Sequence, residues 1–85
     1  MTDLEFDLLD ELYFVKPFGE IRNALGWEDE IILKTLGSLL EKGWIRCYFT
    51  PTDEILDEEI DLAGNFRNYF YLASKDGLSA HNSTE

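Results

Sequence analysis

The chain has 85 residues, 45% of them hydrophobic, and carries a formal net charge of -11 at pH 7. This length allows one small domain, and the content of aromatic and aliphatic residues is too high for an intrinsically disordered chain. The single cysteine, Cys47, excludes an intramolecular disulfide and a cysteine-rich metal site, and the lack of a recognisable signal peptide or membrane-spanning run predicts a cytoplasmic protein.

The N-terminal segment is expected to form a helix that ends before Pro17. Thr2 and Glu5 have the spacing of a capping box, in which each side chain accepts a hydrogen bond from a free amide of the other residue. Pro17 disfavours a helical conformation of the residue before it. The apolar stripe is formed by residues three or four positions apart: Leu4, Leu8, Leu12 and Val15.

Two further helices are predicted over residues 18–25 and 28–42. Gly26 is placed to end the first in a left-handed conformation, and Gly43 ends the second. Three acidic residues at positions 28–30 lie in the first turn of the longer helix, where the helix dipole favours negative charge. Its buried stripe is expected to contain Ile32, Leu36, Leu39 and Leu40.

Residues 44–49 and 68–73 are rich in aromatic and branched residues and predict two strands that pair antiparallel, joined by an acidic loop. Alternation along the second strand assigns Phe70 and Leu72 to the core and exposes Tyr69 and Tyr71. These tyrosines, next to Tyr48, would form an apolar patch suited to a homodimer. Residues 74–77 predict a turn or a short helix. The domain is expected to span residues 1–79, and residues 80–85 are expected to form a polar, frayed tail.

This order of elements resembles the winged helix-turn-helix transcriptional regulators over residues 4–78. The resemblance implies an α+β fold: a single winged-helix domain with a three-helix core, a two-stranded antiparallel wing and a short C-terminal helical turn. In that family the third helix enters the major groove of DNA and the wing contacts the flanking backbone. The residues that match the family pattern are Leu25 and Gly26, the segments 41–45 and 71–77, and the core residues Ile32, Leu36 and Leu39.

The charge distribution argues against DNA binding by the residues that the resemblance points to. The outward positions of the 28–42 helix hold one lysine and three acids, and six acids with no base lie in residues 53–61. Non-specific affinity for DNA comes from cationic side chains that displace counterions, so such a wing repels the phosphate backbone. A DNA-binding regulator remains the alternative, and it would have to use Arg22, Lys34, Lys42, Arg46 and Arg67.

The leading hypothesis is therefore a protein–protein interaction or regulatory module that binds a protein partner or a second copy of itself. The acidic segment could be a solvated or self-docked loop, a partner contact, a mimic of nucleic acid or, least expected, a calcium site. Apolar residues alternate with its acids, which favours docking on a hydrophobic surface of this chain or of a partner. The candidate partner-binding residues are Asp53, Glu54, Asp57, Glu58, Glu59, Asp61, Tyr69 and Tyr71.

No catalytic, cofactor or metal site is predicted. His81 is the single histidine and lies near the C-terminus without a cysteine or second histidine to share a metal. Cys47 lies on a predicted strand, where cysteine is more often a small buried hydrophobe than a nucleophile. We therefore do not expect an enzyme.

Overall fold

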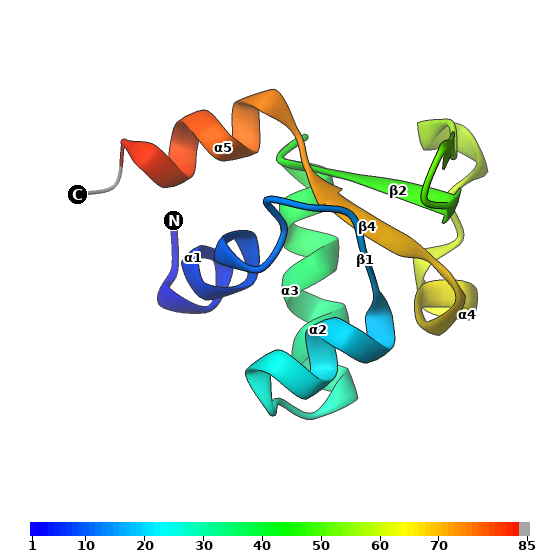
Figure 1. Cartoon of the computed structure of the whole chain (residues 1–85), viewed down its shortest axis with the longest axis horizontal. Coiled ribbons are helices and arrows are strands. Elements are labelled where there is room, and N and C mark those ends of the chain that lie inside the picture. The colour runs from blue at the N-terminus through cyan, green and yellow to red at the C-terminus, as the bar shows by residue number, and fades with distance from the viewer. Residues whose placement is uncertain (84–85) are drawn as a thin grey trace.

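The computed structural model describes residues 1–83, which form an α+β domain of five α-helices and a four-stranded antiparallel sheet (Figure 1). The helices are α1 (Asp3–Asp10), α2 (Phe18–Leu25), α3 (Asp29–Glu41), α4 (Leu62–Asn65) and α5 (Lys75–Asn82). The strands are β1 (Lys16–Pro17), β2 (Ile45–Thr50), β3 (Asp53–Glu54) and β4 (Phe70–Ala73). Two short 3-10 helices, η1 (Asp57–Glu59) and η2 (Phe66–Asn68), lie between β3 and β4.

The first helix has the predicted capping box, but it is shorter than predicted and buries a different face. It ends at Asp10, and Leu4 is exposed while Glu5 faces the core together with Leu8 and Leu9. The prediction that the helix continues to Pro17 is wrong, because the residues after Asp10 form hydrogen bonds and strand pairs with β4 instead of continuing the helix. The Leu12 carbonyl accepts a hydrogen bond from the Ala73 amide at 2.9 Å, and residues 16–17 pair with β4 as the unpredicted strand β1.

The second and third helices are confirmed. Gly26 ends α2 with a φ of 68°, and Gly43 follows α3 with a φ of 74°, both in the left-handed region that favours glycine. The predicted stripe of α3 packs into the core, where Ile32, Leu36 and Leu39 have no exposed surface. Packing of this apolar face rather than helix propensity holds the helix in place.

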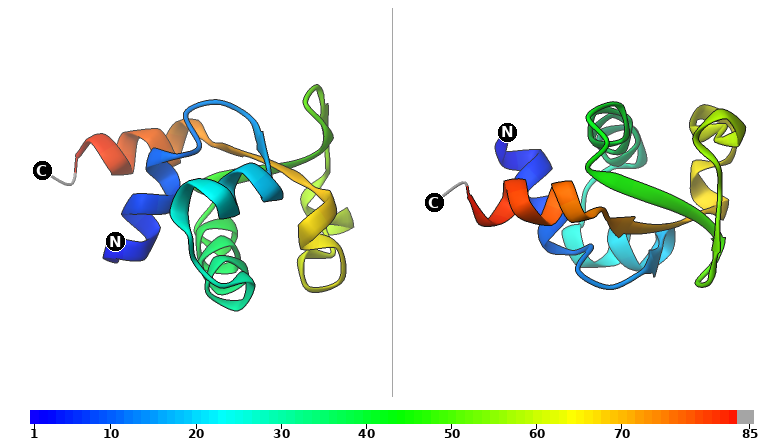
Figure 2. Two further views of the ribbon diagram at one scale, coloured as in Figure 1. Left: turned by 60° about the horizontal axis from the view of Figure 1, so that its bottom comes forward. Right: turned by 90° about the horizontal axis from the view of Figure 1, so that it is seen from above.

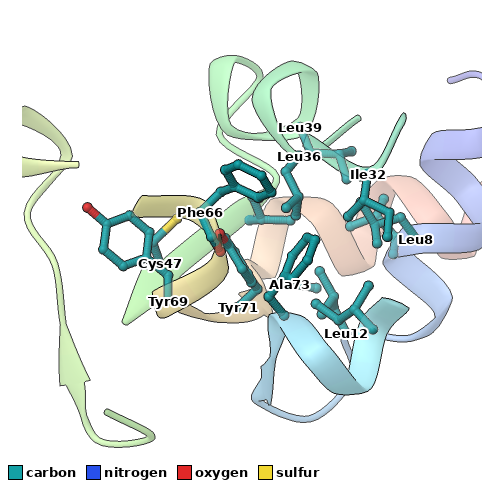
Figure 3. Close-up of a cluster of buried hydrophobic side chains, with 14 of the residues drawn as sticks. Leu8, Leu12, Ile32, Leu36, Leu39, Cys47, Phe66, Tyr69, Tyr71 and Ala73 are labelled. Atoms are coloured by element: carbon teal, nitrogen blue, oxygen red, sulfur yellow. Dashed lines mark hydrogen bonds between the residues drawn. The ribbon is translucent and has the colours of Figure 1, made fainter. Parts of the chain in front are cut away.

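The antiparallel pairing of β2 with β4 is confirmed, and the sheet order is β1-β4-β2-β3. The predicted faces of β4 are reversed, since Tyr71 is fully buried opposite Cys47 (Figure 3). The η2 helix delays the start of the strand to Phe70, and Ala73 rather than Leu72 points inward. Burial of the Tyr71 hydroxyl is tolerated because it donates a 2.6 Å hydrogen bond to the Phe66 carbonyl.

The C-terminal segment is a helix of eight residues, so the short-helix alternative for residues 74–77 is confirmed and the helix extends beyond it. Ser74 caps α5, and its hydroxyl donates to the Gly43 carbonyl at 2.7 Å. The helix continues to Asn82, and His81 is buried against α1, so residues 80–82 do not form the frayed tail that was predicted. Residues 84–85 of that predicted tail lie outside the described residues.

The helices α1 and α5 lie at the end of the molecule that holds both termini, and the segment between β2 and β4 projects at the opposite end (Figures 1 and 2). Within residues 1–83, no helix combines the length and the apolar character needed to cross a membrane.

Candidate interaction surface

Residues 53–61, here called the acidic wing, are anchored to the body of the domain. Ile55 is 1% exposed, and its amide donates to the Cys47 carbonyl at 2.9 Å. Further along, Ile60 packs against the core, and the Asp61 amide donates to the Tyr69 hydroxyl at 3.0 Å. The self-docked form of the loop is thus the one observed, and the apolar residues that alternate with the acids provide the anchors.

All six carboxylates of the acidic wing lie on residues that are exposed. Glu54 forms an ion pair with Arg46 at 2.7 Å, and the Asp61 side chain caps α4. In the part of the chain that the structure describes, the other four make no ion pair: Asp53, Asp57, Glu58 and Glu59.

Two large apolar side chains are exposed on or beside the acidic wing. Leu56 is 61% exposed between the buried Ile55 and the acidic η1 helix, and Phe49 at the end of β2 is 54% exposed. Phe49 packs edge-on against Tyr69 with ring centroids 6.1 Å apart. Sequence reasoning placed Leu56 in an apolar–acidic alternation but missed Phe49, whose position at the end of a strand was the available signal.

The tyrosines predicted to form a dimer patch do not lie on the surface. Tyr69 is 4% exposed and Tyr71 is fully buried, so their assignment to a partner-binding surface is wrong. Figure 3 shows both rings in the buried cluster, with the Tyr69 hydroxyl directed toward its edge. Tyr69 contributes to the wing indirectly, through the hydrogen bond that it accepts from Asp61. Homodimer formation stays a prediction, and it would need a different surface.

Most of the basic side chains are neutralised within the domain. Five of the seven lysine and arginine residues have an acidic partner within 4.0 Å: Lys16, Arg22, Lys42, Arg46 and Arg67. Arg22 and Arg67 both form ion pairs with the carboxylate of Asp29. Arg22 Nε lies 2.8 Å from Oδ1, although the two groups are not aligned for a hydrogen bond, and an Arg67 guanidinium nitrogen lies 2.9 Å from Oδ2. Among the described residues, the two bases without an acidic partner are Lys34 and Lys75.

The five bases of the DNA-binding alternative are therefore not equivalent. Lys34 is exposed on α3, where it borders a shallow hollow of about 230 Å3 with Leu4, Thr35 and Ser38. Each of the other four forms an ion pair with a carboxylate on another part of the fold than its own: Arg22, Lys42, Arg46 and Arg67. The structure thus supplies one unpaired cation along α3 rather than a basic stripe.

A second carboxylate site lies between α1 and α3, at Glu5. Its carboxylate accepts hydrogen bonds from Lys42 at 2.7 and 2.9 Å and from the Ser38 hydroxyl at 2.8 Å. Burial alone would raise the pKa of Glu5, but these bonds, the Thr2 amide and the positive charge of Lys42 together lower the pKa from 4.5 to about 2. Sequence reasoning saw Glu5 only as a capping residue, although its spacing from Leu8 and Leu9 placed it on the buried stripe.

Cys47 has the environment predicted for a structural cysteine. It is fully buried, and burial foremost, with the nearby charge of Asp57, raises the pKa of its thiol to about 12. The nucleophilic thiolate is therefore scarce at neutral pH. Within residues 1–83, no group of three or more histidine, cysteine, aspartate and glutamate side chains is arranged to hold a metal ion.

Comparison with family models, with curated proteins and with solved structures finds no match to this chain.

Proposed function

We propose that this chain is a winged-helix-type module that binds a basic protein segment through its acidic wing. The order of three helices followed by an antiparallel hairpin supports the resemblance to winged helices, and β1 adds a strand next to β4. Under this resemblance, the acidic wing corresponds to the segment with which that family contacts the DNA backbone. Its charge selects a cationic ligand instead of a phosphate backbone.

One observation carries this proposal: among residues 1–83, five acids that make no ion pair lie within the nine residues of the acidic wing, whereas the other seven are spread over the rest of the domain and the lysines and arginines are mostly paired. Asp57, Glu58 and Glu59 project from η1 without an internal cation. Unpaired charges of one sign raise the association rate with an oppositely charged partner, and the effect weakens as salt is added.

The apolar residues of the acidic wing define the partner further. Leu56 lies next to these carboxylates and would be covered by an apolar side chain on the partner. Because Ile55 fixes the loop against Cys47, the wing loses little conformational freedom on binding. A lysine- or arginine-rich segment with an apolar residue between its charges fits this combination.

DNA binding is the competing function, and nothing in the geometry favours it. Contacts to phosphate by Arg22, Arg46 or Arg67 would require each to leave a carboxylate at 2.7–2.9 Å. The cation left to approach DNA along α3 without such an exchange is Lys34.

The test compares two triple variants that change the net charge equally. One is Asp57→Asn, Glu58→Gln, Glu59→Gln in the acidic wing, and the other is Asp7→Asn, Glu20→Gln, Glu41→Gln at exposed acids elsewhere. Immobilised wild-type protein and both variants are incubated with source lysate at low salt, with and without DNase, and binding to a duplex oligonucleotide is measured by fluorescence anisotropy.

We expect a protein that survives DNase, elutes with salt and is lost from the wing variant while the control retains it. Equal capture by both variants would reject the acidic wing as the site. Salt-sensitive duplex binding by the wild type, strengthened or unchanged in the wing variant, would establish the DNA-binding alternative.

A further inference from the structure

We propose that His81 is a pH-sensitive latch whose protonated ring holds the last turn of α5 on α1. The ring is 8% exposed and stacks on Phe6 with centroids 4.1 Å apart. It also contacts the Tyr13 ring edge-on, with centroids 5.4 Å apart. This contact between the two terminal helices is independent of the acidic wing at the other end of the molecule (Figure 1).

The hydrogen-bond partners of His81 favour one arrangement of the protons. The Tyr13 hydroxyl donates its one hydrogen to Asn82 Oδ1 at 3.0 Å. The same hydroxyl lies 2.9 Å from His81 Nδ1, and once its own hydrogen is used on Asn82 it can only accept there, so we assign the hydrogen of this pair to Nδ1. A neutral ring with its hydrogen on Nδ1 has only a lone pair on Nε2.

That lone pair faces a carboxylate. Nε2 is buried and has no hydrogen-bond partner, and Asp10 Oδ1 lies 3.4 Å away. Two acceptors opposed at this distance repel each other, whereas a proton on Nε2 converts the contact into an ion pair. The cationic ring therefore satisfies all four groups in a chain from Asp10 through His81 and Tyr13 to Asn82.

The two ends of α5 are held by different contacts, so the last turn can loosen while the first turn stays in place. At the first turn, the Gly77 amide donates to the Ser74 side chain, and Gly77 packs directly on the backbone of Trp44. The last turn is held by His81 and by the link between Asn82 and Tyr13. Among residues 1–83, Asp10 is the charged group within ion-pair distance of the ring, on the helix against which it packs. Loss of the proton thus weakens the last turn selectively.

The test is amide hydrogen exchange and ring 15N NMR on the full chain at about pH 5 and about pH 8, the range in which histidine changes charge. We expect protection of the last-turn amides of α5, corrected for intrinsic exchange, to fall by about three- to tenfold at the higher pH. First-turn protection should change less. The Asp10→Asn variant should lose most of this pH dependence, while Asp7→Asn, at an exposed acid of the same helix, should keep it.

His81→Phe provides a second check because it keeps an aromatic ring against Phe6 but cannot be protonated. Its last turn should be equally protected at both pH values. The proposal fails if wild-type protection of that turn is independent of pH. It also fails if the 15N shifts show a neutral ring with its hydrogen on Nε2 at both pH values, because that tautomer donates to Asp10 without taking up a proton.

Discussion

Glu5 and the carboxylates of the acidic wing lie at opposite ends of the domain and have opposite environments. Glu5 is 2% exposed and accepts four hydrogen bonds from Thr2, Ser38 and Lys42. By contrast, Asp57, Glu58 and Glu59 are exposed, and the described residues supply them with no cationic partner. The first carboxylate joins two helices, and the other three leave a negative charge that no described residue neutralises.

The difference shows why net charge alone does not assign function. Removing the charge of a buried, paired carboxylate leaves its donors without an acceptor, so it costs stability. Removing an exposed, unpaired carboxylate costs the fold little and changes only what the surface attracts. Substitutions at the two ends should therefore separate stability from binding.

The largest effect is expected at the end that holds α5, from Gly77→Ala. A Cβ atom at this position would overlap the backbone carbonyl of Trp44, which cannot move without disturbing the start of β2. We expect the free energy of unfolding to fall by about 3 kcal/mol or more, at or beyond the upper end of the usual cost of overpacking, in urea denaturation. Gly37→Ala is the control, because its Cβ would meet Leu62 Cδ2 at an ordinary 3.7 Å and would raise helix propensity. Equal effects of the two substitutions would contradict the packing argument.

The anchor of the acidic wing should come next. Ile55→Ala removes a fully buried side chain and leaves a cavity beside Cys47, so we expect a loss of about 3 kcal/mol by thermal or urea unfolding. Leu56→Ala, one residue further along, should change stability by less than about 0.5 kcal/mol. Its predicted effect is instead on partner affinity. If Leu56→Ala destabilises the domain as much as Ile55→Ala, Leu56 packs internally and cannot contact a partner.

Glu5→Gln isolates the charge of the buried carboxylate, since glutamine can still complete the capping box. The loss of charged hydrogen bonds to Lys42 should cost about 2 kcal/mol at neutral pH. The pKa of Glu5 is lowered in the folded state, so its contribution is present above about pH 4.5 and disappears as the pH falls toward 2. Urea titrations of wild type and variant should therefore converge in acid. A constant difference down to pH 2 would contradict this assignment, and Asp7→Asn should show neither effect.

The sequence was sufficient for elements with strong local signals and insufficient where tertiary contacts decide. The helices α2 and α3 followed from apolar periodicity and from the glycines that end them. Strand β1 could not be predicted, because two residues carry no periodic pattern and pair only with the distant β4. The face of β4 was misassigned because a tyrosine was treated as a surface residue. The hydrogen bond from Tyr71 to the Phe66 carbonyl, which makes its burial tolerable, depends on the η2 turn.

The candidate site was predictable in composition but not in organisation. Six acids with no base distinguish residues 53–61 from the rest of the chain in the sequence itself. The pairing of Arg46 with Glu54, and of Arg22 and Arg67 with Asp29, needed the fold, because Arg67 and Asp29 are 38 positions apart in the sequence. Those ion pairs are what turn an acidic composition into an acidic surface.

The smallest effect on stability, and the sharpest contrast with Glu5, is expected for the wing triple variant Asp57→Asn, Glu58→Gln, Glu59→Gln. These residues form η1 without ion pairs to the domain, and neighbouring like charges repel, so the free energy of unfolding should stay within about 0.5 kcal/mol of wild type. Adding salt should raise the stability of wild type slightly more than that of the variant. Salt screens the repulsion between the three carboxylates in wild type, whereas the substitutions have already removed that repulsion in the variant. A loss comparable to that of Glu5→Gln would mean that the wing carboxylates have structural partners. Unchanged stability together with lost partner capture would show that carboxylates of the same chemical type serve the fold at one end of this chain and recognition at the other.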